Sequence, residues 1–449
     1  MARSLFRFLI ASCLSFVLLS VTLWADGWRF DGTGRFPAKN PPVNWSKENN
    51  IAWKAELPGR SLASPVIVGT RAFVTSDPAE LICFSIQDGE MVWQQSHEYA
   101  NLFGAAKGEK IEADLTLAKG VRKQRDDLNR ERGEAKKAEQ IQKAEQLQAK
   151  IELLDNRYRE LIAYPPKPGG DTGNSTSTPV CDGKDIYAVF ATGIVSSHSL
   201  AGKRNWMTYV EGARGDHSAS PLLLDGKLIV HLRDVVALDA RNGDVLWRVK
   251  TDERHGSPVA AEIAGAAVLV TANGDIIRVS DGELIVKRQF RLGHNSPIVE
   301  AGTIYALEDG AVKAFQLPSS TELPADSKLE LKWELSSTRA NQLASPIVHN
   351  GLLYGVGERG ILEVADVKTG KRIYRKRLDF GGGRVDASLC LAGELLFVSS
   401  TRGVTLVLKP GREFEQVTRN ELEGFSSSLA FSENRMFART PKHLICIKE

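Results

Sequence analysis

Short apolar runs separated by turn signals recur along most of this chain. The clearest stretch is Ser220–Trp247, which contains four such runs: Leu222–Leu224, Lys227–His231, Val235–Leu238 and Asp244–Trp247. Turns at Asp225-Gly226 and Asp239–Gly243 separate them. Runs of this length between Asp-Gly and Asn-Gly type turns predict a four-stranded antiparallel meander. One such sheet cannot bury its own apolar faces, so the pattern predicts that several copies stack.

Eight copies of the pattern align on a small residue at the start of the first strand. The anchors are Ser64, Ser177, Ser220, Ser257, Ser296, Ser345, Ser388 and Ser428. Most fourth strands also carry an aromatic residue, which we interpret as structural: Trp93, Trp206, Trp247, Trp333 and Tyr374. The fourth and seventh copies lack it and are degenerate. From the second copy on, the period of about 40 residues is typical of a propeller blade of four strands.

The eighth copy ends at Glu449 after its third strand, and the missing strand lies at the other end of the chain. Ile51–Leu57 has the strand pattern, and Trp53 stands about as far before Ser64 as Trp247 stands before Ser257. We therefore predict that this N-terminal strand completes the last blade and closes the ring, which removes the open sheet edge. An open solenoid, with Ile51–Leu57 unpaired, is the alternative.

The repeat resembles a known family. The residues that carry the likeness are Ser220-Pro221, Ala237-Leu238-Asp239, Asn242-Gly243 and Leu246-Trp247. They are similar to the PQQ-like (quinoprotein) propeller repeat. Trp28–Gly34 and Trp45–Pro58 look like the leading segment of secreted bacterial members. The resemblance implies an all-β fold, an eight-bladed propeller of four-stranded blades closed by the N-terminal strand.

One insertion interrupts the repeats, at residues 94–176. Leu147, Ile151, Leu154, Tyr158 and Leu161 step by three and four, as in an a/d seam. The chain must return to the propeller, so we predict an α-helical coiled-coil hairpin that breaks near Gly133, with a Pro/Gly-rich exit. The hairpin is either a self-paired decoration or a docking arm for a partner. The remaining parts are 26–93, with the leading segment, the ring-closing strand and the first blade, and 177–449, with the other blades.

The first 25 residues read as a secretory signal peptide, with Arg3 and Arg7 before the apolar run Phe8–Leu23 and cleavage after Ala25. We expect an exported protein, periplasmic or extracellular, with an uncleaved membrane anchor as the alternative. The net charge of +3 gives no basic footprint for nucleic acid. A disulfide between Cys83 and Cys446 is conceivable, but buried, inert thiols are the favoured interpretation.

The loops from each fourth strand to the next first strand should converge on one mouth of the channel. They carry candidate ligand-binding residues: Arg60, Arg214, Asp216, His217, Arg254, His255, His294, Arg339, Arg384 and Asp386. Arginines and histidines around one rim would suit a carboxylated or phosphorylated ligand. Equally, polar loop ends can simply satisfy backbone and water. Histidines without tight spacing do not predict a metal site.

The sequence favours binding over catalysis. It has no adjacent cysteine pair, CxxCH, GxSxG, HExxH or P-loop motif. We predict no catalytic residues and no cofactor. The favoured hypothesis is a scaffold of the bacterial envelope, similar to BamB-type propellers, that binds protein partners, with oligomeric state left open. The opposed hypothesis is an oxidoreductase that uses PQQ, with calcium, or another small molecule in the Arg/His-lined mouth.

Overall fold

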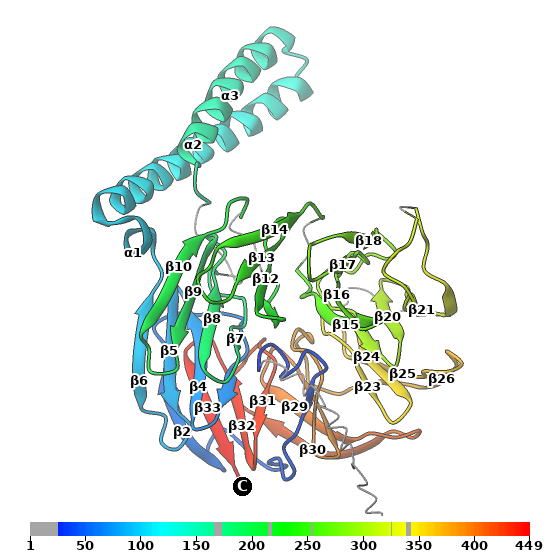
Figure 1. Ribbon diagram of the computed structural model, residues 1–449. Coiled ribbons are helices and arrows are strands. Elements are labelled where there is room, and N and C mark those ends of the chain that lie inside the picture. Colours follow the sequence, from blue (N-terminus) through cyan, green and yellow to red (C-terminus); the bar gives the residue numbers. More distant parts are fainter. Residues whose placement is uncertain (1–25, 166–172, 214–217, 253–254, 325, 338–342) are drawn as a thin grey trace, which may run out of the picture.

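The computed structural model describes residues 26–165, 173–213, 218–252, 255–324, 326–337 and 343–449. Within these residues the strands form eight sheets, which stand in a ring (Figure 1). Each sheet contains a four-stranded antiparallel meander, as the turn pattern predicts. The predicted eight-bladed β-propeller is therefore confirmed.

In each blade the first strand lies innermost. Blade 1 consists of β3 (Val66–Val68), β4 (Arg71–Ser76), β5 (Glu80–Ser85) and β6 (Met91–Ser96). Blade 2 consists of β7 (Val180–Cys181), β8 (Asp185–Val189), β9 (Ile194–Ser199) and β10 (Arg204–Tyr209). Blade 3 consists of β11 (Leu222–Leu224), β12 (Lys227–His231), β13 (Val235–Asp239) and β14 (Val245–Val249). Blade 4 consists of β15 (Val259–Ile263), β16 (Ala266–Val270), β17 (Ile276–Arg278) and β18 (Leu284–Val286).

The second half of the ring repeats this plan. Blade 5 consists of β19 (Ile298–Glu300), β20 (Thr303–Glu308), β21 (Ala311–Gln316) and β22 (Leu331–Ser336). Blade 6 consists of β23 (Ile347–His349), β24 (Leu352–Val356), β25 (Ile361–Asp366) and β26 (Arg372–Arg377). Blade 7 has β27 (Cys390–Ala392), β28 (Leu395–Ser399), β29 (Val404–Lys409) and β30 (Glu415–Glu421). Blade 8 has β31 (Ala430–Ser432), β32 (Arg435–Arg439), β33 (His443–Lys448) and β2 (Ile51–Glu56).

The last blade joins the two ends of the chain. Strand β2 pairs antiparallel with β33, with Trp53 opposite Cys446 and Glu56 opposite His443. The N-terminal strand thus supplies the missing outer strand of blade 8. This confirms the predicted closure, and the open-solenoid alternative is wrong.

The segment before β2 has a role that the sequence did not predict, because it enters the channel. Asp26 forms an isolated bridge with Cys181 of blade 2, and β1 (Arg35–Phe36) pairs in parallel with β27 of blade 7. Between them, the buried Arg29 side chain donates hydrogen bonds to the carbonyls of Pro346 and Leu389, at 2.7 and 3.0 Å. We call Asp26–Phe36 the plug, because it crosses the channel from one side of the ring to the other.

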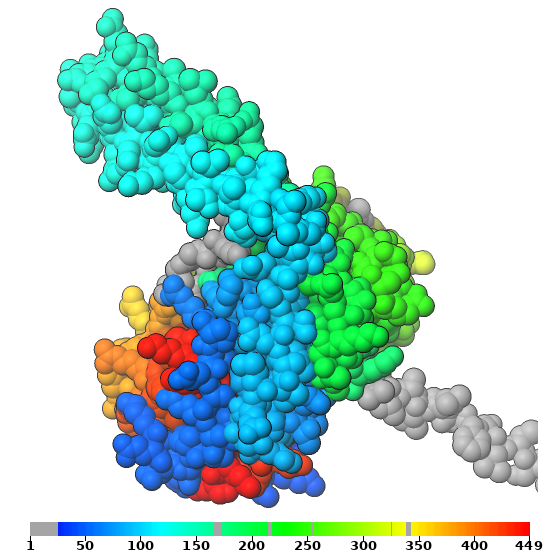
Figure 2. Space-filling model, turned by 90° about the vertical axis from the view of Figure 1, so that its left-hand side faces the viewer, coloured from blue at the N-terminus to red at the C-terminus, as the bar shows by residue number. Residues whose placement is uncertain are grey.

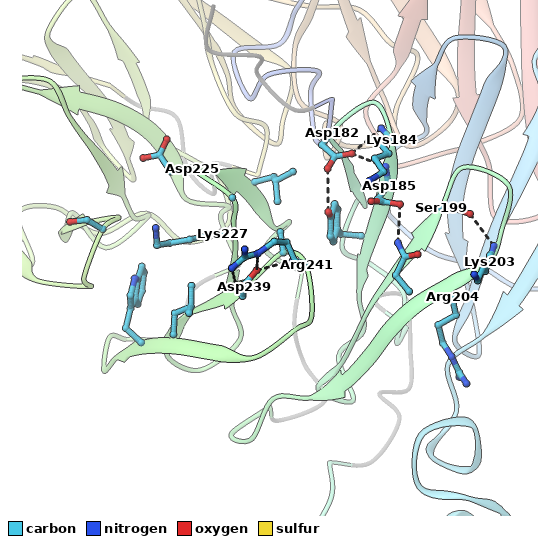
Figure 3. Close-up of a pocket in the computed structure, with 18 of the residues that line it drawn as sticks. Asp182, Lys184, Asp185, Ser199, Lys203, Arg204, Asp225, Lys227, Asp239 and Arg241 are labelled. Atoms are coloured by element: carbon cyan, nitrogen blue, oxygen red, sulfur yellow. Dashed lines mark hydrogen bonds and ion pairs between the residues drawn. The ribbon is translucent and has the colours of Figure 1, made fainter. Parts of the chain in front are cut away.

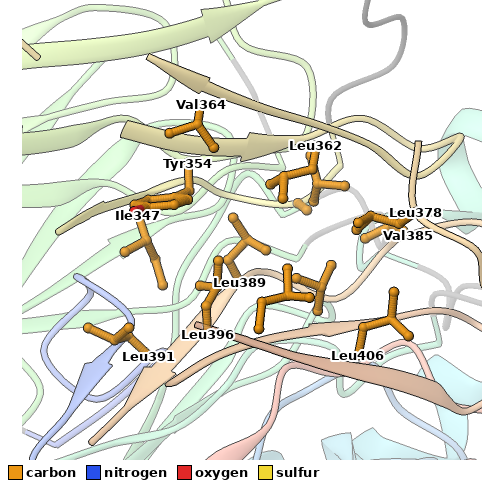
Figure 4. Packing of buried hydrophobic residues seen from close by; sticks show 14 of the residues in the cluster. Ile347, Tyr354, Leu362, Val364, Leu378, Val385, Leu389, Leu391, Leu396 and Leu406 are labelled. Carbon is orange, nitrogen blue, oxygen red and sulfur yellow. The ribbon is translucent and has the colours of Figure 1, made fainter. Parts of the chain in front are cut away.

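The hydrophobic core lies between neighbouring blades. Strands whose two faces both pack against another sheet are buried along their whole length, as β24 and β13 are. Figure 4 shows one such layer, in which Tyr354 and Leu362 of blade 6 face Leu396 and Leu406 of blade 7. Burial is therefore shared among the interfaces around the ring, so no blade is independent of its neighbours.

Five tryptophans join one blade to the next through the same contact. In each, the indole N–H donates to a backbone carbonyl of the following blade at 2.9–3.0 Å: Trp53 to Ile86, Trp93 to Leu200, Trp206 to Ala240, Trp247 to Val279 and Trp333 to Val367. The ring covers a glycine of that blade so closely that a Cβ there would clash. The glycines are Gly89, Gly202, Gly243, Gly282 and Gly370. Tyr374 instead stands edge-on to Phe414 of blade 7.

The insertion forms three helices, α1 (Tyr99–Phe103), α2 (Ala105–Lys137) and α3 (Ile141–Leu161). Helices α2 and α3 form an antiparallel hairpin that projects from the propeller (Figures 1 and 2). The predicted break near Gly133 is wrong, because Gly133 lies inside α2 and the turn follows at Glu139, which has a left-handed φ of 58°. At 1.5 Å per residue, α2 is about 50 Å long. None of the helices in the described ranges has the length and apolarity needed to cross a bilayer.

The four cysteines of the described chain are buried free thiols: Cys83, Cys181, Cys390 and Cys446. Burial raises the pKa of Cys446 to about 12 and also raises that of Cys83. The Cys83–Cys446 disulfide considered from the sequence is not present.

Candidate binding sites: the channel cup and the helical arm

The described rim residues fall into two groups, and the first is a pair of histidines. His255 and His294 stack with ring centroids 4.7 Å apart and an interplanar angle of 15°. They come from the loops that lead into blades 4 and 5, which the sequence predicted to converge. The Ser218 hydroxyl lies 3.2 Å from His255 Nδ1 and orients that ring.

The second group is an ion pair on the loop that leads into blade 7. Arg384 Nε donates to Asp386 at 2.7 Å, and Ser426 Oγ donates to the other oxygen of the same carboxylate at 3.1 Å. The positive charge of Arg384 is therefore balanced within the rim. Arg60 is exposed and does not line the cup described below.

The other predicted rim residues lie outside the described residues. They are Arg214, Asp216, His217, Arg254 and Arg339. Three of the five predicted rim arginines belong to this group, so the predicted positive funnel stays a prediction.

Below the rim, a ring of hydroxyl groups surrounds the channel. The backbone N–H of each residue in the ring donates to the hydroxyl of the residue on the next blade at 2.9–3.1 Å. In the described chain this holds for the pairs Ser64–Thr178, Thr178–Ser220, Ser220–Ser257, Ser296–Ser345, Ser345–Ser388, Ser388–Ser428 and Ser428–Ser64. The repeated small anchor of the sequence is thus a hydroxyl acceptor. The step from Ser257 to Ser296 differs, since the Ser296 hydroxyl finds no partner among the described residues.

The ring, the rim and the plug together form a cup of about 470 Å³. Its lining includes the hydroxyl residues, both histidines, the Arg384–Asp386 pair and Trp28 from the plug. The plug closes the channel just beyond the ring, because Arg29 bonds to the carbonyls of Pro346 and Leu389, each next to a ring serine. A cup with many hydroxyls, one aromatic ring and balanced charge can hydrogen-bond a small polar molecule. Its described residues do not form a catalytic triad of a nucleophile, a base and a carboxylate that orients the base.

The second candidate is the helical arm, defined as α1 to α3, and its base is a cluster of aromatic rings. Tyr99, Phe103, Tyr164 and Tyr209 contact one another with centroids 5.2–6.4 Å apart. Tyr209 belongs to β10, so the arm leaves blade 1 but packs on blade 2. The Tyr99 hydroxyl also donates to the Pro165 carbonyl at 2.9 Å.

Two further contacts fix the direction of the arm. Lys107 Nζ lies 4.0 Å from the centre of the Phe103 ring, a cation–π contact. Gly108 packs on Ala100 so closely that a Cβ would lie 2.4 Å from Ala100 Cα. Helix α2 therefore crosses α1 at a distance that only glycine allows. The arm is anchored rigidly at its base, while Leu117, Ile141 and Leu153 are exposed farther along it.

A polar groove lies at the turns of blades 2 and 3 (Figure 3). Its labelled charges comprise four aspartates and five basic residues. They are Asp182, Asp185, Asp225, Asp239, Lys184, Lys203, Lys227, Arg204 and Arg241, of which the last holds Asp239 at 2.6 Å.

 Asp281 adds a fifth aspartate, so the whole lining has five aspartates and five basic residues and is balanced in charge. The groove therefore indicates no particular ligand chemistry.

Sequence reasoning missed the plug and the aromatic base of the arm. Trp28 and Arg29 lie in a segment with no repeat, and only its likeness to the leading segment of secreted propellers pointed to it. Tyr99 and Tyr164 stand at the two ends of the insertion, and their spacing in the sequence gives no sign that they meet.

Comparison with known proteins places the chain in a family. The profile of the family described as outer membrane protein assembly factor BamB matches residues 42–163 and 232–449, more than half of the chain. The chain belongs to this family. The matched residues include β2, blade 1, the whole arm and the ring from β13 of blade 3 onward. No curated protein sequence matches the chain.

Solved structures with the same fold include a BamB and an enzyme. BamB from Moraxella catarrhalis aligns with a TM-score of 0.56 and 14% identity over 89% of this BamB-family chain and 97% of that chain. Quinohemoprotein alcohol dehydrogenase from Comamonas testosteroni aligns with a TM-score of 0.57 and 10% identity over 94% and 80%. The computationally designed protein Ika8 aligns at 0.52 and 9% over 89% and 100%. At these identities the likeness shows the propeller fold alone.

Proposed function

We propose that this chain is a non-catalytic scaffold of the bacterial cell envelope that takes part in the assembly of outer-membrane proteins. The observation that carries the proposal is the match to the BamB family, which covers the arm and the propeller except blade 2 and the first two strands of blade 3. The balanced charge of the cup and the rigid base of the arm support binding rather than chemistry. In this proposal residues 1–25 are the export signal, and the mature chain begins at Asp26.

The arm is the element that we propose for docking a partner protein. Its base is held by aromatic contacts and by the Gly108–Ala100 crossing, so its orientation on the ring is fixed. A rigid arm loses little conformational entropy when it binds, which favours affinity. Its exposed apolar residues, Leu117 and Leu153, lie beyond the base, where a partner can reach them.

The test is a chain without the outer part of the arm. Val121 is joined to Tyr158 by a short Gly/Ser turn, which removes residues 122–157 and keeps the base residues Ile111, Leu115 and Leu161. We expect an unchanged propeller by near-ultraviolet circular dichroism and thermal unfolding. In a strain that lacks the chromosomal copy, this variant should fail to restore the level of folded outer-membrane β-barrel proteins that the full chain restores.

The outcomes separate the two parts of the proposal. If the strain without the chain keeps normal levels of folded β-barrel proteins, the assembly role is wrong. If the shortened chain restores them fully, the role stands but the outer part of the arm, residues 122–157, is a decoration. Mass spectrometry of the purified protein checks the export signal, since cleavage after Ala25 leaves Asp26 as the first residue.

A second candidate function is a quinone-dependent oxidoreductase, and the cup with Trp28 is the observation that favours it. A bound PQQ would need cations for its carboxylates and oxygen ligands for calcium. The described cup residues do not fit these needs, since Arg384 is paired with Asp386 and no three potential metal ligands cluster among the residues searched. Titration with PQQ and calcium, followed by absorbance and thermal shift, tests this candidate. Saturable binding that Arg384→Ala abolishes would favour the enzyme, and no binding at high micromolar PQQ would exclude it.

A further inference from the structure

Two histidines are buried together where the arm leaves the propeller. His97 follows β6 directly, and Glu98 after it is the N-cap of α1. His198 lies on β9 of the neighbouring blade. Both side chains are 0% exposed, and their ring centroids are 5.1 Å apart in an edge-to-face arrangement.

The pair connects the blade 1–blade 2 interface to the base of the arm. His97 stacks on Phe190 of blade 2 at 4.6 Å, and its Nδ1 lies 3.2 Å from the Ala79 carbonyl of blade 1. Because side chains alternate along a strand, His198, Ser196 and Ile194 share one face of β9. Ile194 belongs to the buried cluster of Tyr99 and Leu115 at the base of the arm. A change in the contact between the two histidines would therefore be transmitted to the cluster that holds the base of the arm.

Several polar atoms at this interface lack a hydrogen-bond partner in the described part of the chain. They are His97 Nε2, His198 Nδ1 and Nε2, Ser196 Oγ and Thr192 Oγ1. Buried polar atoms are normally paired, so this concentration at one interface is unusual for a junction with a purely structural role.

The groups around the pair do not favour a positive charge. Blade 2 presents the guanidinium of Arg204, which acts on both histidines, together with Phe190. Blade 1 presents Trp93 and backbone carbonyls, with the Cys83 thiol deeper in the same interface and Glu80 bonded to Gln94. The base of the arm presents the neutral Tyr99 and, behind it, the Glu112 carboxylate, which acts on Tyr99 and not on either histidine. Protonation of either ring here would bury a charge that no carboxylate offsets.

Burial is the main cause that lowers both histidine pKa values. It lowers the pKa of His97 to about 3, with His198 and Arg204 adding to the effect, and that of His198 to about 4, with Arg204 adding. Both side chains are therefore neutral in the closed interface throughout the physiological range of pH.

We propose that His97 and His198 form an acid-sensitive joint that holds the arm at a fixed angle at neutral pH and releases it in acid. In the closed interface the pair is neutral and packed. When the interface opens, solvent reaches both rings and each can take up a proton. The joint depends on no particular partner, so it holds whether or not the arm docks one.

The direction of the effect follows from proton linkage. An open, solvated histidine titrates near its ordinary pKa of about 6.5, whereas the closed pair titrates far lower. Above about pH 6.5 neither form takes up protons, so the closed form keeps its full stability. As the pH falls below that value, only the open form takes up protons. With two protons, the opening equilibrium rises about 1000-fold between pH 8 and pH 5.

The experiment measures the angle of the arm against pH in the full mature chain. Spin labels at Ile141→Cys, at the exposed tip of the arm, and at the exposed Glu330→Cys, just before the outer strand of blade 5, report a distance distribution by pulsed electron resonance. The native cysteines are buried and stay unlabelled. We expect one narrow distribution at pH 8 and a broader one at pH 5, with an unchanged far-ultraviolet circular dichroism spectrum.

Two variants decide the cause. His97→Phe with His198→Phe keeps the ring contacts but cannot titrate, so its distribution should stay narrow at pH 5. His349→Gln, which removes a half-buried histidine from blade 6, should respond as the wild type does. The proposal is wrong if the wild-type distance is the same at pH 8 and pH 5, or if the double variant broadens as the wild type does.

A single variant covers the case in which the double variant does not fold. His198→Phe leaves one titrating ring, so hydrogen exchange of the β6 and β9 amides should depend on about one proton instead of two between pH 6 and pH 5. An unchanged dependence on two protons would also overturn the proposal.

Discussion

Apart from Ser296, each described hydroxyl of the channel ring accepts a backbone N–H from the neighbouring blade, which explains why the repeat keeps a hydroxyl at this position. The backbone N–H at the start of an inner strand points toward the next blade and is buried there, so it needs an acceptor. Serine supplies one with little volume, and threonine does the same at Thr178. A small residue that recurs in a sequence can thus mark a hydrogen-bond acceptor as well as a position where two backbone segments pack closely.

The ring offers a matched pair of substitutions. Ser345→Ala removes the acceptor of the Ser296 N–H and leaves that group buried and unpaired, which should lower the free energy of unfolding by about 1–3 kcal/mol. Ser296→Ala removes a hydroxyl that has no partner in the described chain, so it should cost less than half as much. Urea denaturation with equal m-values measures the difference, and equal losses would contradict it.

At the scale of single residues, the sequence predicted the repeated features and missed those that occur once. The serine anchors and the blade tryptophans recur with the period of the fold, and recurrence makes them visible. Arg29 and the His97–His198 pair occur once, and their contacts join residues far apart in the chain. Only their three-dimensional positions make these residues stand out.

At the scale of elements, the arm shows where local sequence signals suffice. The three-and-four spacing predicted five buried positions in α3, and the structure buries Leu147, Ile151 and Leu161 but leaves Leu154 and Tyr158 half-buried. Gly133 suggested a break, yet a glycine inside a helix costs only about 1 kcal/mol, and packing against α3 offsets it. Ala135 and Leu128, on either side of Gly133, belong to that packed cluster. Tertiary contact, rather than propensity, sets the end of α2.

Two glycines of α2 test the fixed crossing at the base. Gly108→Ala places a methyl group against Ala100 and should loosen the contact between α1 and α2, lowering the melting temperature and the protection of their amides from exchange. Gly120→Ala meets open space, so the higher helix propensity of alanine should stabilise the arm by up to about 1 kcal/mol. If both variants are stabilised, the crossing is not as tight as the structure has it.

At the scale of the whole molecule, closure of the ring makes strand β2 contribute as much to stability as a strand from the middle of the chain. Trp53 and Trp333 make the same contact, each with an N–H bond to the next blade and a ring over a glycine. In an open array a terminal blade frays, whereas in a closed ring no blade is terminal. The same contact should therefore have the same weight at both positions.

We expect Trp53→Ala and Trp333→Ala to destabilise the protein by similar amounts, about 3–5 kcal/mol each, with a single unfolding transition in both. Thermal unfolding followed by near-ultraviolet circular dichroism measures this. A second, early transition in the Trp53 variant alone would mean that the two ends of the chain separate before the ring unfolds.

Closure of the ring by β2 and β33 also determines the order in which contacts form during folding. In chain order β2 precedes all the other strands of the eight blades, and β33 follows them. Until β33 is available, β2 has no partner and two blade edges stay open, so the closing step follows synthesis of the other blade strands and, in an exported chain, their passage through the membrane. Loop closure over nearly the whole chain is slow, and open edges invite wrong pairing. The β2–β33 pairing, which looks like any other strand pair in the finished ring, is therefore the last of the blade contacts to form.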